Sequence, residues 1–252
     1  MDRKNLKIIE ERIRQGHEFH VIRVFDDNSG TLKRLVLDEK DSGELPEPLY
    51  EVTKLIKSEM AAPRLAANVK DMTYGVAGFT KVIAEGLRPK FKLVVFGAGH
   101  VGQAVGLIGA LLGFDVIVID DRSEFASRKR LPDPRINLVV GDYGKVIASL
   151  NLGSTSAVVI VTRGHQFDEV CLRAIVKSNA GYMGMIGSKR RVLSVISKLV
   201  KDGFAEADFK KLHAPIGLRI GARSPQEIAV AILAEIIEHF NGKNLRQETG
   251  SV

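Results

Sequence analysis

Three glycines, Gly97, Gly99 and Gly102, stand in a G-x-G-x-x-G pattern directly after an apolar run. In this spacing the first glycine makes a tight turn, the second lets a phosphate approach the backbone, and the third lets a helix pack closely on the preceding strand. Asp120 follows at about the 20-residue spacing from which a carboxylate can accept hydrogen bonds from ribose hydroxyls. The pattern predicts a dinucleotide site. His100, at the start of the helix, could contact a phosphate, contact a reacting group or fill the turn.

Polar residues also gather after a later apolar run, where Thr162 and Arg163 precede His165 and Asp168. If a helix begins near His165, then His165 and Asp168 lie three residues apart on one face. Such a pair can do acid–base chemistry or bind a metal together with a third ligand. An anion-binding helix start, with Asp168 in the first turn, explains the same residues equally well. Thr162 and Arg163 are therefore predicted to bind cofactor, and His165 and Asp168 are candidates for catalysis.

Two further polar segments follow. Gly187 and Ser188 open the basic turn 188–191, which could hold a phosphate at a helix N-terminus or be a solvated turn. His213, beside a short sixth strand, is a third candidate for catalysis. Arg122 leaves room for a 2′-phosphate, although Asp120 would repel one, and a surface charge is the favoured interpretation of Arg122. The single cysteine, Cys171, excludes an intramolecular disulfide and any multi-cysteine metal site, and no metal site is predicted.

Alternating strands and helices must position these residues. Apolar runs predict strands over 91–96, 116–119, 136–140, 157–161 and 182–186, with helices between several of them. Strands and helices that alternate in this way form a parallel sheet with helices on both faces. The fold class expected is therefore α/β, a Rossmann-like doubly wound parallel sheet. In such a sheet the ligand lies beyond the carboxyl ends of the strands, at the switch in strand order.

The last helix has a clear N-terminal signal, because Ser224-Pro225-Gln226-Glu227 forms a capping box with proline at the first helical position. The residues that follow are apolar on nearly every side of the helix. We therefore expect this helix to pack between the sheet and another surface, which could be that of a second copy of the chain in a homodimer.

Residues 1–88 differ in pattern from residues 89–252 and predict a small α+β domain before the Rossmann-like one. A helix is expected over 6–13, a hairpin from 18–25 and 31–40, a helix over 48–60 and a single strand within 75–86. The two domains would meet near Arg88.

The composition is that of an ordinary globular protein, with 45% hydrophobic and 27% charged residues. The net charge of +7 is spread along the chain among acids, which favours a solvated surface, and no nucleic-acid-binding module accompanies it. The first residues are too charged for a signal peptide, and no apolar window is long enough to span a membrane. The sequence predicts a cytoplasmic protein that binds neither membrane nor nucleic acid.

From Leu93 onward the sequence resembles the C-terminal Rossmann domain of the XdhC/CoxI family, accessory proteins that mature molybdenum hydroxylases such as xanthine dehydrogenase. The resemblance is carried by FGAGHVGQAV (96–105), VTRGHQFDEVCLRA (161–174), YMGMIGSKRRV (182–192) and HAPIGLRIGARSPQEIAVAILAEI (213–236). It implies a factor that binds a nucleotide or the molybdenum cofactor and assists its insertion or sulfuration in a client hydroxylase. It favours an accessory protein over an enzyme that turns over.

The N-terminal part departs from the family pattern, in which cysteines stand in two glycine-containing segments. The nearest counterparts here, 41–48 and 74–82, contain no cysteine. Two alternatives stay open. One is an NAD(P)-dependent oxidoreductase, although no sizeable substrate domain and no Tyr-x-x-x-Lys pair follow. The other is a nucleotide-sensing regulatory module.

Overall fold

The computed structural model describes residues 7–9, 11, 19–26, 31–37, 71–76, 79–87 and 91–241. The chain divides into two compact units, of which the second spans Lys90–Gly242. The helix expected over 48–60 lies outside the described residues.

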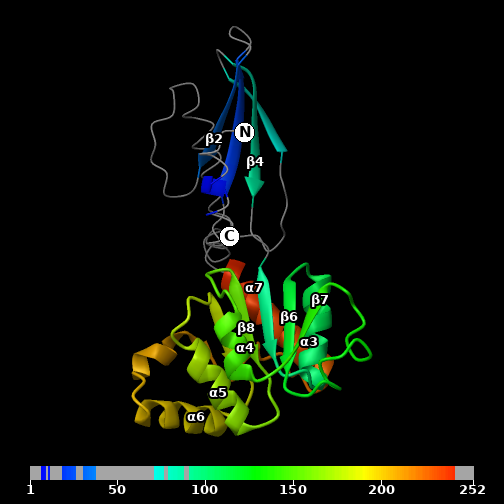
Figure 1. Cartoon of the computed structure of the whole chain (residues 1–252), viewed down its shortest axis with the longest axis vertical. Coiled ribbons are helices and arrows are strands. Elements are labelled where there is room, and N and C mark those ends of the chain that lie inside the picture. The colour runs from blue at the N-terminus through cyan, green and yellow to red at the C-terminus, as the bar shows by residue number, and fades with distance from the viewer. Residues whose placement is uncertain are drawn as a thin grey trace, which may run out of the picture. The chain divides into compact units, whose positions relative to one another are not determined.

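The described part of the first unit is a four-stranded antiparallel sheet in the order β2-β1-β4-β3 (Figure 1), together with residues 7–9 and 11, which are helical and lie within the helix expected over 6–13. Its strands are β1 (Phe19–Asp26), β2 (Thr31–Leu37), β3 (Asp71–Val76) and β4 (Phe79–Leu87). The predicted hairpin is confirmed by β1 and β2. The single strand expected within 75–86 is wrong, because β3 ends at Val76 and β4 begins at Phe79 as its antiparallel partner. Val76–Phe79 is the closing pair of that hairpin, and the register shifts just before it, which breaks the regular alternation.

The second unit is built on a six-stranded sheet in the order β10-β9-β8-β5-β6-β7, and every pairing in it is parallel. The strands are β5 (Lys92–Phe96), β6 (Asp115–Asp120), β7 (Ile136–Val140), β8 (Ser156–Ile160), β9 (Tyr182–Met185) and β10 (Leu212–His213). From β5 the chain runs outward through β6 to β7, and it then returns to the other side of β5 as β8. This reversal places the topological switch between β5 and β8, and the predicted doubly wound fold is confirmed.

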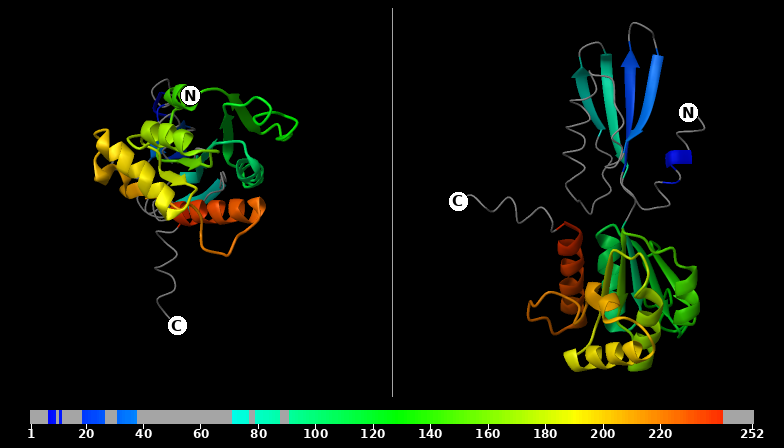
Figure 2. Two further views of the ribbon diagram at one scale, coloured as in Figure 1. Left: turned by 90° about the horizontal axis from the view of Figure 1, so that it is seen from below. Right: turned by 90° about the vertical axis from the view of Figure 1, so that its left-hand side faces the viewer.

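Helices cover both faces of this sheet (Figures 1 and 2). They are α3 (His100–Leu111), α4 (Tyr143–Ser149), α5 (His165–Ile175), α6 (Lys189–Lys201) and α7 (Pro225–Asn241), with a 3₁₀ turn, η1 (Glu206–Lys211), after α6. Helix α3 packs against α7, whereas α4 and α6 both pack against α5. Because the central strands are covered on both sides, every residue of β8 and four of the five in β5 are buried.

Candidate functional site

The three glycines of the turn after β5 have different roles. Gly97 has a φ of +104°, and a β-carbon there would lie 2.5 Å from the carbonyl oxygen of Val161. A β-carbon at Gly102 would overlap the carbonyl oxygen of Gly97. A β-carbon at Gly99 would meet nothing within 4 Å. Gly97 and Gly102 therefore hold the turn against its neighbours, and Gly99 leaves open space beside the backbone, as a phosphate would need.

The first turns of the helices fall into two groups. The N-cap residues of α3 and α5 are Gly99 and Gly164, and neither helix has a side-chain cap. By contrast, Asp142 caps α4, Ser188 caps α6 and Ser224 caps α7. The first N–H groups of a helix have no partner within it, so an uncapped helix start keeps its donors for a ligand. Helices α3 and α5 follow β5 and β8, which pair directly at the switch.

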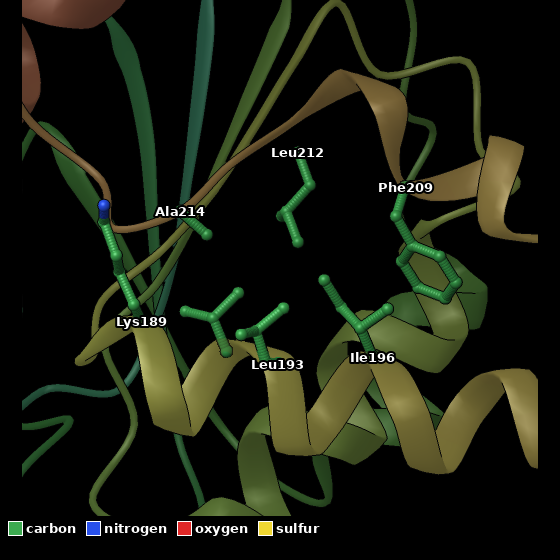
Figure 3. A pocket seen from close by; sticks show the side chains of 7 residues that line it. Lys189, Leu193, Ile196, Phe209, Leu212 and Ala214 are labelled. Atoms are coloured by element: carbon green, nitrogen blue, oxygen red, sulfur yellow. The ribbon is translucent and has the colours of Figure 1, made fainter.

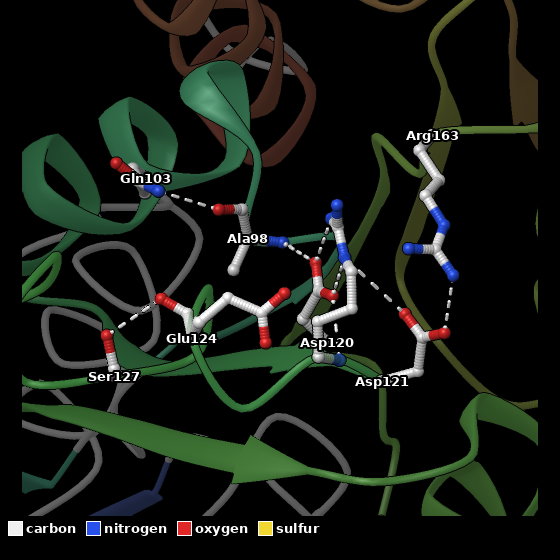
Figure 4. A network of polar contacts seen from close by, with 8 residues as sticks. Ala98, Gln103, Asp120, Asp121, Glu124, Ser127 and Arg163 are labelled. Atoms are coloured by element: carbon white, nitrogen blue, oxygen red, sulfur yellow. Dashed lines mark hydrogen bonds and ion pairs between the residues drawn. The ribbon is translucent and has the colours of Figure 1, made fainter.

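Asp120 ends β6 as a fully buried carboxylate. It accepts hydrogen bonds from Ala98 N (2.7 Å) and from the Arg122 backbone (3.1 Å), and from Nε (2.8 Å) and Nη2 (3.0 Å) of the Arg122 guanidinium (Figure 4). Burial alone would raise the pKa of Asp120, but the donors of Arg122 and Ala98 outweigh it and hold this pKa below its usual value. The predicted interpretation of Arg122 as a surface charge is wrong. A ribose hydroxyl could reach Asp120 only if Arg122 moved aside.

An ion pair links the two strands that flank β5. Arg163, after β8, donates from Nη2 to Oδ2 of Asp121, after β6, at 2.8 Å (Figure 4). The other Asp121 oxygen, Oδ1, is buried and accepts no hydrogen bond from the described residues. Arg163 is 44% exposed, so its guanidinium is accessible at the carboxyl edge of the sheet. The sequence placed Asp121 among the polar residues at the strand ends but did not indicate its pairing with Arg163, because the two are 42 positions apart and only the strand order brings them together.

Asp168 is also fully buried, in the first turn of α5. Its Oδ1 accepts a hydrogen bond from Thr162 Oγ1 at 2.5 Å, and its Oδ2 accepts from Nε of Arg191 at 2.7 Å and from Nη2 of the same guanidinium. Both carboxylate oxygens are therefore engaged. His165 begins α5, and its side chain lies outside what the structure describes. The acid–base pair of His165 and Asp168 stays a prediction.

Some polar residues of the turn before α6 make contacts within the domain and are not available to a ligand. Ser188 Oγ accepts a hydrogen bond from Arg191 N at 3.2 Å, and the Arg191 side chain is bound to Asp168. Gly187 precedes this cap with a φ of +147°. Lys189 and Arg190 are exposed. The cations that this turn offers to a ligand are therefore Lys189 and Arg190, and not Arg191.

His213 belongs to a different cluster, centred on Glu235 of α7. Glu235 lies 3.0 Å from His213 Nδ1 and accepts hydrogen bonds from the Tyr182 hydroxyl (2.8 Å) and Gly217 N (2.6 Å). The His213 and Tyr182 rings stack with centroids 4.5 Å apart. Burial raises the pKa of Glu235, yet the donors from Gly217, Tyr182 and His213 outweigh it and lower this pKa overall. The cluster joins α7 to the outer strands β9 and β10, so the contacts of His213 are not those of the glycine turn or of Asp168.

The single cysteine and the arrangement of possible metal ligands limit the chemistry that the described residues can perform. Cys171 is fully buried, and burial raises the pKa of its thiol, as expected for an inert cysteine. Among the described residues no group of three or more His, Cys, Asp or Glu side chains is arranged to hold a metal ion. None of the described helices is long and apolar enough to cross a membrane.

A parallel sheet in this order, with a glycine turn and open helix starts at its switch, defines a Rossmann-like α/β domain. The family model of the XdhC Rossmann domain matches residues 93–236, and the chain belongs to that family. The resemblance inferred from the four sequence stretches is thereby confirmed.

Curated relatives agree with this family. The chain is 32% identical over 213 residues to the uncharacterized protein YqeB of Escherichia coli K12, covering 84% of this chain and 38% of that protein. It is 28% identical over 159 residues to a protein of Bacillus subtilis 168 described as a probable subunit of xanthine dehydrogenase, covering 63% and 46%. It is 22% identical over 151 residues to the molybdenum cofactor insertion chaperone PaoD of E. coli K12, covering 60% and 41%. The chain thus spans less than half the length of each of these relatives.

A solved structure has the same fold. The crystal structure of a xanthine dehydrogenase from Bacillus halodurans matches 99% of this chain and 70% of its own with a TM-score of 0.64, at 19% sequence identity.

Proposed function

We propose that this protein is an accessory factor of the XdhC type. In this proposal it binds a phosphate-bearing cofactor at the switch between β5 and β8 and assists cofactor insertion or sulfuration in a molybdenum hydroxylase client. The observation that carries the proposal is the pair of uncapped helix starts, at Gly99 and Gly164, side by side at the ends of paired strands. The names of two relatives, a molybdenum cofactor insertion chaperone and a probable subunit of xanthine dehydrogenase, support the choice of client.

The residues fit a dinucleotide in its phosphate part. The open N–H groups of α3 beside Gly99 would bind the pyrophosphate, and His100, which is exposed, would border it. Arg163 could exchange Asp121 for a phosphate oxygen, since both partners are accessible at the edge of the sheet. NAD(P) or another dinucleotide is therefore the ligand class proposed. The molybdenum cofactor shares the phosphate and is the second ligand to test.

Sulfur transfer by a cysteine of this chain has less support. The chain has one cysteine, Cys171, and it is buried with a raised thiol pKa. A thiol that stays protonated inside the core cannot act as a nucleophile or sulfur carrier. We therefore assign to this chain the holding and delivery of cofactor, with any sulfur supplied by another protein.

The Gly99→Val variant tests the site. The valine meets open space, and the N-cap φ of −68° and ψ of −174° suit a β-branched residue, so the fold should persist. The side chain would occupy the place of the pyrophosphate, and calorimetric affinity for NAD⁺ or NADP⁺ should fall by at least about tenfold. The matched control is Asp142→Ala, which removes the cap of α4 and should leave affinity unchanged.

Mass spectrometry of ligand released from the purified protein separates the functions. A pterin or molybdopterin supports the accessory role, and bound NAD(H) with turnover would favour the oxidoreductase instead. A nucleotide bound without turnover, and without effect on hydroxylase maturation, would favour the regulatory module. Unchanged affinity in Gly99→Val would refute the site.

The proposal includes three further predictions. Residues 1–88 and 89–252 act as separate domains, the protein works in the cytoplasm, and α7 contributes to a homodimer. Val230 of α7 is 47% exposed, and an exposed apolar side chain on this helix supports the homodimer proposal.

A further inference from the structure

A groove of ≈ 260 Å³ lies between α6 and residues 209–214, in η1 and the segment after it (Figure 3). It is lined by Lys189, Val192, Leu193, Ile196, Phe209, Leu212 and Ala214. Six of the seven side chains are apolar, and Leu193 is 62% exposed. An exposed aliphatic side chain beside a concave apolar surface is typical of a site where another molecule binds.

The groove lies at the margin of the core, because Val192 and Phe209 of its lining belong to the core. Val192, Val195 and Leu199 are buried and form the stripe that packs on the rest of the domain. Leu193 and Ile196 lie beside that stripe, on the flank that faces Phe209 and Leu212 (Figure 3). Ile196 is partly buried and packs against the core, so Leu193 is the apolar side chain of this flank that the domain leaves exposed.

The groove does not suit a dinucleotide. Pockets for drug-sized ligands are roughly 300–1,000 Å³ and carry several polar groups that orient the ligand. Here the volume is smaller, and Lys189 supplies the one charged group of the lining. The groove suits a few apolar side chains of a polypeptide better than it suits a cofactor.

Unpaired cations lie on α6 and η1, which both contribute to this lining. Among the described residues, five exposed cations of α6 and η1 make no ion pair: Lys189, Arg190, Lys201, Lys210 and Lys211. The acids of the same region are mostly neutralised, since Asp202 pairs with Arg173 and Asp208 pairs with Lys177. Glu206 alone among the acids of α6, η1 and their junction has no cation partner in the described structure. Lys189 lines the groove, and Arg190, Lys210 and Lys211 are next to lining residues in the sequence. These four cations, the rim, outnumber the unpaired acid beside the apolar floor.

We propose that this groove docks an acidic amphipathic segment of a partner protein. Its apolar side chains would fill the space between Leu193, Ile196 and Phe209, as in other helix-in-groove complexes. Its carboxylates would pair with the cations of the rim, which would speed association and fix the orientation. Because the groove starts at Lys189, directly after Ser188, the bound partner would lie beside the carboxyl edge of the sheet. The proposal does not depend on nucleotide binding.

The test uses the full chain and two fluorescein-labelled synthetic peptides. Both have leucine at helical i, i+3 and i+4 spacing, and their remaining positions are glutamate in one and lysine in the other. We expect the glutamate peptide to bind in fluorescence anisotropy, with affinity that falls as salt rises, and the lysine peptide not to bind. Leu193→Glu should weaken binding by about tenfold or more, because it places a charge in the centre of the groove.

Leu111→Glu is the matched control. Leu111 is a leucine on α3, 73% exposed, and it does not line the groove, so this variant should bind the glutamate peptide as the wild type does. Both substitutions are at exposed positions, and circular dichroism with a thermal melt checks that the fold persists. Equal loss in both variants, or none in Leu193→Glu, would overturn the proposal.

Two other outcomes would also overturn it by giving the groove a different occupant. One is a dimer in sedimentation that dissociates in Leu193→Glu without any peptide, which would assign the groove to a second copy. The other is binding to phosphatidylglycerol vesicles that Leu193→Glu abolishes while peptide binding is absent. That result would assign the groove to a membrane surface.

Discussion

The helices that start at the topological switch differ from the other helices of the sheet domain in how their first turns are satisfied. Helices α3 and α5 follow Gly99 and Gly164 without a side-chain cap, whereas Asp142, Ser188 and Ser224 cap α4, α6 and α7. In a capped helix the first backbone N–H groups donate to the N-cap side chain, whereas in an uncapped helix these N–H groups stay free. Two helices of one domain are thus left open, and they are those that flank the expected ligand.

Two carboxylates at the same edge of the sheet are, by contrast, fully engaged by hydrogen-bond donors of the protein. Asp120 is bound by Ala98 and Arg122, and Asp168 by Thr162 and Arg191. Both are fully buried. The edge therefore offers donors to an anion, while its buried acids hold the surrounding loops. This arrangement fits recognition of a phosphate better than proton abstraction by Asp120 or Asp168.

The largest loss of stability is expected on removal of a buried carboxylate whose two oxygens both accept hydrogen bonds. Asp168→Ala leaves the partly buried guanidinium of Arg191 and the hydroxyl of Thr162 without their partner. Breaking a buried pair in this way costs about 3 kcal/mol of unfolding free energy. Urea denaturation measures the loss.

Glu169→Ala is the control on the same helix. Glu169 pairs with Arg173 and Lys198, whose side chains are 39% and 62% exposed, so its removal should cost about 1 kcal/mol or less. Similar losses in the two variants would show that the buried contacts of Asp168 stabilise the fold no more than the exposed ion pairs of Glu169 do.

A smaller, pH-dependent effect is expected for Glu235→Gln. The pKa of Glu235 is lowered in the folded state, so the carboxylate contributes stability above its unfolded pKa of about 4.3. That contribution is lost as the pH falls through the lowered folded value. At neutral pH the variant should therefore be less stable by about 1–2 kcal/mol, and the difference should shrink on acidification below about pH 4.

Thermal melts from pH 7 downward compare Glu235→Gln with Glu238→Gln, which changes an exposed residue of the same helix. A constant difference between wild type and Glu235→Gln over this range would contradict the assigned hydrogen bonds. The Glu238 variant should follow the wild type throughout.

The smallest effect on stability comes from exchanging the two kinds of helix start. Asp142→Ala opens α4 and should cost about 1 kcal/mol, whereas Gly99→Asp gives α3 a cap and should add only a few tenths, ~0.3 kcal/mol. The new carboxylate would also repel a phosphate, so Gly99→Asp should lose nucleotide binding while gaining stability. Calorimetry and thermal melts of both variants check this. If Gly99→Asp still binds NAD⁺ or NADP⁺ normally, the open start of α3 is not the phosphate site.

Much of the sheet domain was predictable because its signals are local. Apolar runs mark β5, β8 and β9, since strands covered on both faces must be apolar throughout, and similar runs mark the less buried β6 and β7. The glycine turn, the Ser188 cap and the Ser224–Glu227 capping box depend on residues only a few positions apart. The hairpin of β3 and β4 was not predicted, because β3 has no continuous apolar run and is identified as a strand by its pairing with β4.

The sequence by itself determined the order of the elements, the glycine turn and the helix caps. Only the tertiary structure decided which charges meet: Arg163 with Asp121, Arg191 with Asp168, and His213 with Glu235. The reason is physical. Periodicity and capping act over one or two turns of chain, whereas these partners are 42, 23 and 22 positions apart and meet through strand order and helix packing.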